Sequence, residues 1–275
     1  MCRYRAGSAY LRSPAVGALA SAVRWQPAGC RRRHAWGPLQ GGFRPWRAPH
    51  VAEDDQIMAM KTTGFPEVDA LYKASEGKVD LVDVPEFGFV TVDGAGAPDD
   101  ETFAHAIQAL YSVSYGAHFL LKKAQGQAPR VMALEALWWV EGSEAQAMMR
   151  LIAAGQASMD ASDRADWRWR LMIAQLPPIE ATIIEEAITD AKAKKSIDAL
   201  DGVRFERWTE GPSAQILHVG PYATEQLSVI ALHEAIADNG LRPRGRHHEI
   251  YLGDPRRAEP EKLRTILRQP VEPAS

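Results

Sequence analysis

The sequence predicts an α+β fold, in which two pseudo-symmetric strand–helix–strand–strand units share an antiparallel sheet, with helices on one face and a ligand groove between the units. Strand-like and helix-like patterns alternate from about residue 61 onward. Their order in residues 79–176 is repeated in residues 203–271. In each half a strand ends at a glycine, a helix follows, and the next strand carries a glutamate, Glu135 or Glu249.

The first half begins with a strand over Leu81–Val92, which is rich in β-branched and aromatic residues and precedes a glycine turn at Gly94. Asp99 and Asp100 can cap a helix that runs to about Lys123, because its apolar positions keep a 3.6-residue period. The remaining elements predicted here are strands over 131–140 and 167–175, a helix over 144–154 and an exposed loop over 155–166.

The second half follows an amphipathic helix predicted over 179–195, whose apolar residues recur at helical spacing. A turn is expected at Glu210-Gly211-Pro212, since glycine and proline interrupt strands. The predicted elements are strands over 203–209 and 214–219, a helix over 223–238, and strands over 247–252 and 263–269.

The composition indicates a soluble globular protein, because 46% of the 275 residues are hydrophobic and 24% are charged. No apolar run approaches the roughly 20 residues of a membrane span, so a membrane partner is not expected. The net charge of -3 hides an asymmetry: residues 1–52 hold nine arginines and no acidic residue. The rest carries 23 basic and 35 acidic residues, a net of -12, so nucleic acid is not an expected partner.

The Arg-rich leader, residues 1–57, allows three interpretations: an organelle transit peptide, a nucleic-acid-binding tail, or a disordered tail or start codon assigned too early. We favour the last, because the leader has no periodic apolar face. It contains both cysteines, Cys2 and Cys30. The domain expected over 58–275 therefore has no disulfide or thiol chemistry, which fits a cytoplasmic location.

Glu249 and Tyr251 are two residues apart on one strand, so their side chains point to the same face. Glu135 also lies in an apolar strand followed by aromatic residues. A buried glutamate must be paired, hydrogen-bonded or protonated, although either residue could instead lie on a solvated sheet face. Because the arrangement occurs in both halves, we expect the glutamates to line a cavity.

Aromatic residues are concentrated around these strands, which predicts a stacking cage for a flat aromatic ligand. Filling of a small core is the alternative explanation. Because every second residue of a strand points to the same face, Trp139 rather than Trp138 should share the face of Glu135. The candidate ligand-binding residues are Tyr115, Trp138, Trp139, Trp167, Trp169, His247 and Tyr251.

No cofactor or metal is predicted. His247, Glu249 and His218 could suggest a metal site, but no second spaced pair of the zinc type is present. His248 should face away from Glu249 and serve packing or hydrogen bonding. Whether the protein is a monomer or a homodimer is not decided by the sequence.

Residues 73–271 also resemble the GyrI-like small-molecule-binding proteins, in particular a stand-alone branch similar to cyclopropanoid cyclopropyl hydrolases. The matching motifs are, in chain order, Val84-Pro85-Glu86, Asp93-Gly94-x-Gly96, Ala109-Leu110-Tyr111-x-x-x-Tyr115, Leu134-Glu135-x-Leu137-Trp138-Trp139, Trp167-x-Trp169, His218-x-Gly220-Pro221-Tyr222 and His247-His248-Glu249-Ile250-Tyr251-Leu252-x-Asp254-Pro255-Arg256-Arg257. The resemblance implies two units around a groove for flat, aromatic or cationic compounds, with Glu249 as the central acid.

The resemblance further implies a reaction in which water opens a strained cyclopropane of a DNA-alkylating compound. Glu249 would act as the base, with Glu135 as the alternative, and Tyr111 would donate to the developing oxyanion. A non-catalytic protein that sequesters such compounds, or a ligand sensor acting through a partner, remains the competing expectation. A DNA-binding sensor is disfavoured because the leader shows no helix-turn-helix pattern.

Overall fold

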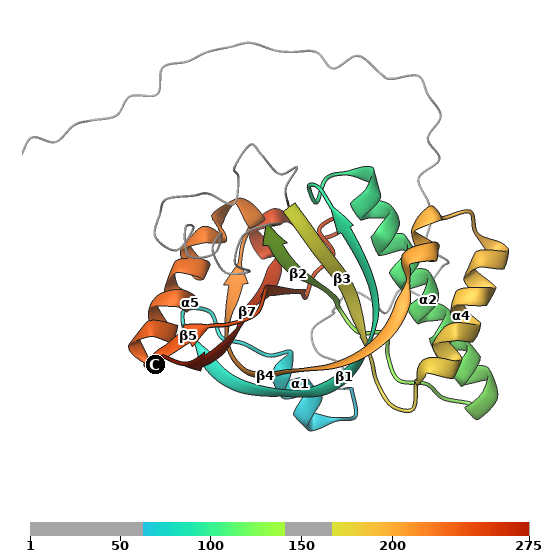
Figure 1. Cartoon of the computed structure of the whole chain (residues 1–275), viewed down its shortest axis with the longest axis horizontal. Helices are drawn as coiled ribbons and strands as arrows, with labels where there is room; N and C mark the ends of the chain where they lie inside the picture. The colour runs from blue at the N-terminus through green and yellow to red at the C-terminus, as the bar shows by residue number, and fades with distance from the viewer. Residues whose placement is uncertain (1–62, 141–166, 275) are drawn as a thin grey trace, which may run out of the picture. The chain divides into compact units, whose positions relative to one another are not determined.

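The computed structural model describes residues 63–140 and 167–274, all within one compact unit, Val51–Ser275. The helix and loop predicted over 144–166 and the leader lie outside the described residues. Seven strands, four α-helices and three short 3-10 helices follow one another within the described ranges (Figure 1). They are α1 (Pro66–Leu71), β1 (Asp80–Ala95), α2 (Glu101–Gln125), β2 (Leu134–Val140), β3 (Trp167–Gln175), α4 (Ala181–Lys194), η2 (Asp198–Gly202), β4 (Arg204–Val219), η3 (Tyr222–Thr224), α5 (Gln226–Asp238), β5 (Leu241–Pro243), β6 (His247–Tyr251), η4 (Pro260–Lys262) and β7 (Arg264–Pro273).

The strands form an antiparallel sheet that closes on itself. Its order is β4-β1-β3-β2-β6-β7-β5, and β4 also pairs with β7, so six strands complete a barrel. The short β5 extends the sheet beyond β7. Closure leaves the six strands with hydrogen-bonded neighbours on both sides, which removes the unpaired edges of an open sheet.

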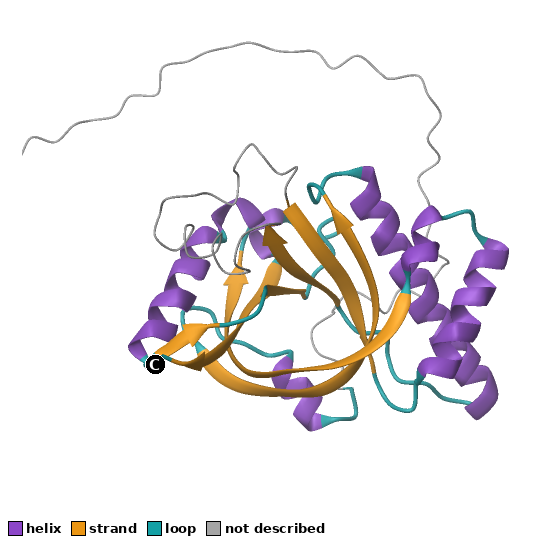
Figure 2. Cartoon of the chain, in the orientation of Figure 1, coloured by secondary structure: helices purple, strands orange, loops and turns teal. Residues whose placement is uncertain are grey.

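The helices lie outside the ring of strands (Figure 2). α2 packs on β1 and β3, α4 packs on α2, and α5 packs on β4, β5 and β7. Gly116 of α2 permits the close α2–α4 approach, because a Cβ atom there would lie 3.3 Å from the Cβ of Ala187. Among the described residues, no helix combines the length and apolar character needed to cross a membrane.

Most predicted elements are confirmed, and β3 has the predicted bounds. Two predictions were wrong: Gly94 lies within β1, paired with Trp169, rather than in a turn, and the two strands proposed around Glu210-Gly211-Pro212 are a single strand, β4. Gly211 adopts a positive φ of 71° inside that strand, so the glycine bends the backbone without ending the ladder. The short elements α1 and β5 were not predicted.

Each half of the domain contains a long strand, a helix on the outside of the barrel and two shorter barrel strands, and the second half adds the three-residue β5. The long strands β1 and β4 pair with each other over much of their length. β2 and β6, the strands that carry Glu135 and Glu249, also pair with each other. The two glutamates therefore belong to neighbouring strands, and the cross-strand register decides how they relate.

Candidate functional site

The β2–β6 register places the two glutamates on opposite faces of the sheet. Ala136, not Glu135, pairs with Glu249, and Leu137 pairs with His248. Because directly paired residues point the same way, Glu249 shares a face with Ala136 and Trp138, and Glu135 shares the other with His248. The face of Glu249 is the outer one, since Gln175 on the same face of β3 hydrogen-bonds Ser114 of α2.

On the outer face, Glu249 lies at the centre of a group of aromatic residues. The Tyr251 hydroxyl donates to Oε2 of Glu249 at 2.7 Å, and Nε1 of Trp138 donates to the Tyr251 hydroxyl at 3.2 Å. Trp138 stacks on Phe103 of α2 with ring centroids 5.7 Å apart. Trp167 meets Trp138 edge-on at 5.5 Å. We call Glu249, Tyr251, Trp138 and the residues around them the outer cluster.

Burial controls the protonation of Glu249, which is only 4% exposed. Loss of solvent raises the pKa of this carboxyl to about 7, although the hydrogen bond from Tyr251 acts in the opposite direction. The pKa of Tyr251 is raised well above its usual value by burial and by the nearby Glu249 charge, so its hydroxyl stays protonated. The outer cluster thus combines a hydroxyl donor with a carboxyl that titrates near neutral pH.

Two members of the outer cluster, Tyr222 and Glu225, were missed as candidate site residues. Both come from the segment that leads into α5, and Tyr222 meets Tyr251 edge-on at 6.0 Å. Burial and the charges of Glu249 and Glu225 raise the pKa of Tyr222 to about 12. The motif Gly220-Pro221-Tyr222 was the available signal, but it gave no information about which strand it would face.

His247 is completely buried beside Glu249, with its Nε2 3.8 Å from Oε1 of the carboxyl. Desolvation lowers the pKa of this imidazole to about 3, with the nearby His233 and His248 acting in the same direction. Among the described residues, neither ring nitrogen of His247 has a hydrogen-bond partner. His247 is therefore neutral at pH 7 and retains its hydrogen-bonding capacity.

Tyr111 and Tyr115 extend the aromatic surface along α2. Their rings stack with centroids 6.1 Å apart, and Tyr115 stacks in turn on Phe119 at 6.3 Å. Tyr115 is 41% exposed, whereas burial raises the pKa of Tyr111 to about 12. Tyr111 also lies near Leu134, which pairs with Tyr251. These two tyrosines thus lie on the side of the outer cluster that is formed by α2.

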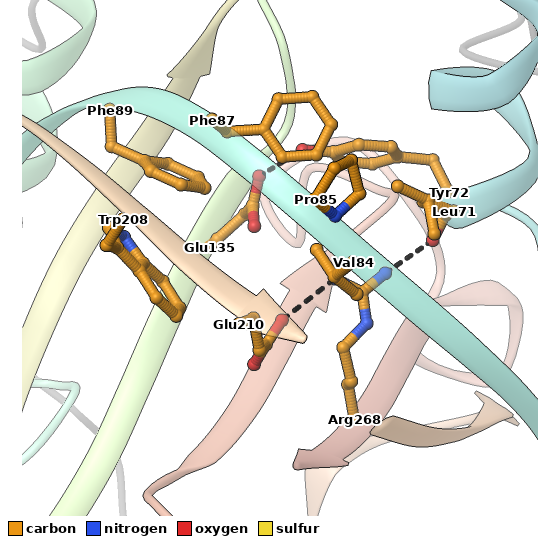
Figure 3. Close-up of a pocket in the computed structure, with 10 residues that line it drawn as sticks. All are labelled: Leu71, Tyr72, Val84, Pro85, Phe87, Phe89, Glu135, Trp208, Glu210 and Arg268. Atoms are coloured by element: carbon orange, nitrogen blue, oxygen red, sulfur yellow. Dashed lines mark hydrogen bonds and ion pairs between the residues drawn. The ribbon is translucent and has the colours of Figure 1, made fainter. Parts of the chain in front are cut away.

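Glu135 belongs to a different group, inside the barrel (Figure 3). The Tyr72 hydroxyl donates to its Oε1 at 2.5 Å, and Nε2 of His248 donates to its Oε2 at 2.9 Å. His248 also bonds Glu210 through Nδ1 at 2.9 Å, and Arg268 bonds Glu210 at 3.2 Å. We call these five residues the inner network. Four of them, Tyr72, Glu135, Glu210 and Arg268, line a cavity of about 10 Å³, which is room for roughly one water molecule.

The inner network is a set of buried charges that compensate one another. The two glutamates raise the pKa of His248 to about 9 against the effect of burial. His248 and Arg268 lower the pKa of Glu210 to about 2, again against burial. Arg268 also donates to the backbone oxygen of Leu71 at 2.5 Å, so the network fastens the end of α1 to the barrel. Its geometry fits a structural role.

Trp139 lies on the inner face together with Glu135, as the alternation of side chains along β2 predicted. The Arg246 guanidinium lies 3.5 Å from the centroid of its ring, a cation–π contact. The structure therefore separates Glu135 and Trp139 from the other predicted site residues. The residues it gathers on the outer face or its α2 side are Tyr111, Tyr115, Trp138, Trp167, Trp169, His247, Glu249 and Tyr251.

A larger groove, of about 430 Å³, lies between α1, β1 and the start of α4. Its apolar lining includes Phe87 and Ile179, and Arg207 at its rim pairs with Glu86 and Glu180. None of the predicted site residues lines it. Within residues 63–140 and 167–274, no three His, Cys, Asp or Glu side chains are grouped to hold a metal ion.

The family comparison identifies the barrel as a small-molecule-binding domain. The profile of the GyrI-like small molecule binding domain matches residues 77–272, so the chain belongs to this family. A structure described as a hydrolase from Listeria innocua is 32% identical, with a TM-score of 0.61, over 76% of this chain and 98% of that one.

A second structure, an uncharacterized conserved protein from Listeria innocua, is 33% identical with a TM-score of 0.63 over the same shares of the two chains. Comparison with curated proteins gave no match. The family assignment confirms the resemblance seen in the sequence motifs and establishes small-molecule binding as the function of the domain.

Proposed function

We propose that this protein binds flat aromatic or cationic compounds in an aromatic cage around Glu249, and that Glu249 promotes hydrolysis of cyclopropane-bearing alkylating compounds held there. One observation carries the proposal. Glu249 is a buried carboxyl with a pKa of about 7, and Tyr251 holds it among the rings of the outer cluster.

The chemistry of the outer cluster favours aromatic cations among small molecules. Indole and phenol rings offer flat apolar surface and attract a cation to their faces. A carboxylate among such rings supplies a counter-charge that bulk water does not screen. The stacked rings of Tyr111 and Tyr115 add surface on the α2 side for a ligand with several fused rings.

Hydrolysis is supported by the pKa of Glu249, since a general base works best when its pKa lies near the working pH. In the proposed step Glu249 removes a proton from water, the water oxygen bonds to a cyclopropyl carbon, and the breaking carbon–carbon bond sends its electrons into the conjugated dienone. The oxygen of that dienone then takes a proton, with Tyr111 as the proposed donor. The description of one Listeria relative as a hydrolase is consistent with this step.

Glu135 remains the alternative base, but its hydrogen bonds to Tyr72 and His248 inside the barrel favour Glu249. The competing function is binding without catalysis, either sequestering toxic compounds or sensing a ligand through a partner protein. The same cage would serve both functions. We also propose that the two halves are pseudo-symmetric, which their shared order of elements supports, and that a groove between them admits the ligand.

The decisive experiment is incubation of the protein with a cyclopropane-bearing alkylator, followed by mass analysis of the compound. A gain of one water, catalysed over many turnovers, is the expected result. Glu249→Gln should lower the rate by about 100-fold or more, the usual contribution of a positioned base. Glu234→Gln, on the exposed side of α5, is the control and should leave the rate unchanged. Recovery of intact compound from saturated protein would favour sequestration instead.

A further inference from the structure

Beside Glu249, three buried polar atoms have no hydrogen-bond partner within residues 63–140 and 167–274. They are Oε1 of Glu225 and both ring nitrogens of His247. Glu225 is 1% exposed and His247 is fully buried. Folded proteins pair the large majority of such atoms, because a buried polar atom left unpaired is destabilising. A concentration of them beside Glu249 indicates a ligand that supplies the missing partners.

Both residues face the Glu249 carboxyl from different elements. Glu225 lies at the N-terminal end of α5, and His247 lies on β6 with Nε2 3.8 Å from Glu249. Burial and the charge of Glu249 raise the pKa of Glu225 well above its usual value, so Glu225 is protonated when Glu249 is ionised. The site then holds one full negative charge, an uncharged carboxyl and a neutral imidazole.

We propose that Glu225 and His247 form a second recognition element of this site, which makes it prefer cations that carry N–H groups over quaternary cations of the same shape. The inference rests on the proposed binding of aromatic cations around Glu249. It adds the chemical class of the cation: protonated amines, amidines and guanidines attached to a flat aromatic body.

The preference follows from hydrogen-bond chemistry. An ammonium N–H can donate to the carboxyl oxygen of Glu225 and to the unprotonated nitrogen of His247. A quaternary cation offers the same charge to Glu249 and the same stacking to the rings, but it has no donor. Its binding would leave the buried atoms unsatisfied and would also exclude any water that could reach them. Tyr222, which is 37% exposed and meets Tyr251 edge-on, is a member of the cluster that reaches solvent.

The test uses (naphthylmethyl)ammonium and its N,N,N-trimethyl derivative, titrated calorimetrically into the full chain at pH 7.5. The ammonium should bind at least about tenfold more tightly, and tenfold corresponds to about 1.4 kcal/mol. Glu225→Leu and His247→Leu should each reduce the preference to threefold or less, with little change in affinity for the trimethyl compound. Glu225→Gln keeps an acceptor oxygen and should keep the preference, and Glu234→Leu on the exposed side of α5 is the matched control.

Two failures are distinguishable. If neither compound binds, or if Glu249→Gln leaves the binding of both unchanged, the proposed function itself is wrong. If both bind equally well and both depend on Glu249, binding stands and the role of Glu225 and His247 is overturned. Persistence of a tenfold preference in folded Glu225→Leu and His247→Leu proteins would overturn it as well. If a leucine variant does not fold, the comparison of the two compounds on the unmodified protein still decides.

Discussion

Replacing His248 with glutamine tests the inner network directly. His248 donates to Glu135 and to Glu210, and all three side chains are buried. Glutamine keeps a similar size and one amide donor, but it cannot carry a charge between the two carboxylates. We therefore expect the variant to fold with a lower free energy of unfolding and with a changed pH dependence.

The magnitude follows from the pKa of His248, which rises from 6.5 in the unfolded chain to about 9 in the folded protein. At about 1.4 kcal/mol per pKa unit, the protonated imidazole contributes about 3 kcal/mol. The folded pKa is raised, so this contribution is fully present below pH 6.5 and is lost as the pH rises through 9. Wild type and His248→Gln should differ by about 3 kcal/mol at pH 6 and by much less at pH 10.

Urea unfolding of both proteins between pH 6 and 10 measures this difference. Subtraction removes the titration of Glu249, which has a pKa of about 7 and lies on the outer face. His247→Gln is the control: because the pKa of His247 is lowered to about 3, its effect on stability depends on pH only below about its unfolded pKa of 6.5, and the difference from wild type should be constant from roughly pH 8 to 10. A stability difference that stays constant from pH 6 to 10 would show that His248 is not charged in the folded protein and would refute the reasoning.

Three further predictions concern the site and the scaffold. Because the pKa of Glu249 is about 7, turnover or cation binding should rise as the pH increases through 7 and level off above it, and Glu249→Gln should remove this step in a pH titration. Arg268→Met should cost about 3–5 kcal/mol in urea unfolding, because it removes one of the two cations, His248 and Arg268, that compensate the buried Glu210 carboxylate. Gly94→Ala should lower stability by roughly 1–3 kcal/mol, since its Cβ would overlap the indole of Trp169. Gly253→Ala meets only Leu263 at 3.8 Å and should change the melting temperature little.

Local patterns in the sequence predicted most strands and helices because each pattern reports on one element at a time. The 3.6-residue period of α2 and the aromatic content of β3 both specify which face is buried. The internal repeat also predicted the order of elements in both halves. Closure of the sheet was not predicted, since it depends on the pairing of β4 with β7, between residues about 50 positions apart.

The candidate site was predicted only where its residues belong to a single strand, because a sequence pattern reports on one element at a time. Parity correctly placed Glu249 with Tyr251, and Trp139 with Glu135, because each pair lies on a single strand. Whether Glu135 and Glu249 share a face depends on the β2–β6 register, and a shift of one residue would reverse the answer. Glu225 could not be assigned to the site because its position depends on how α5 packs against the barrel.

The two clusters are separated only by the thickness of the sheet, because the adjacent residues His248 and Glu249 of β6 point to its opposite faces. The strands that carry the outer cluster are thus held on their inner side by the ion pairs of His248 and Arg268 with buried glutamates. Substitution of an aromatic residue on the outer face should alter which compounds bind without changing the structure of the barrel. Substitutions in the outer cluster could therefore change ligand specificity without loss of the fold, provided that the buried ion pairs inside the barrel are kept.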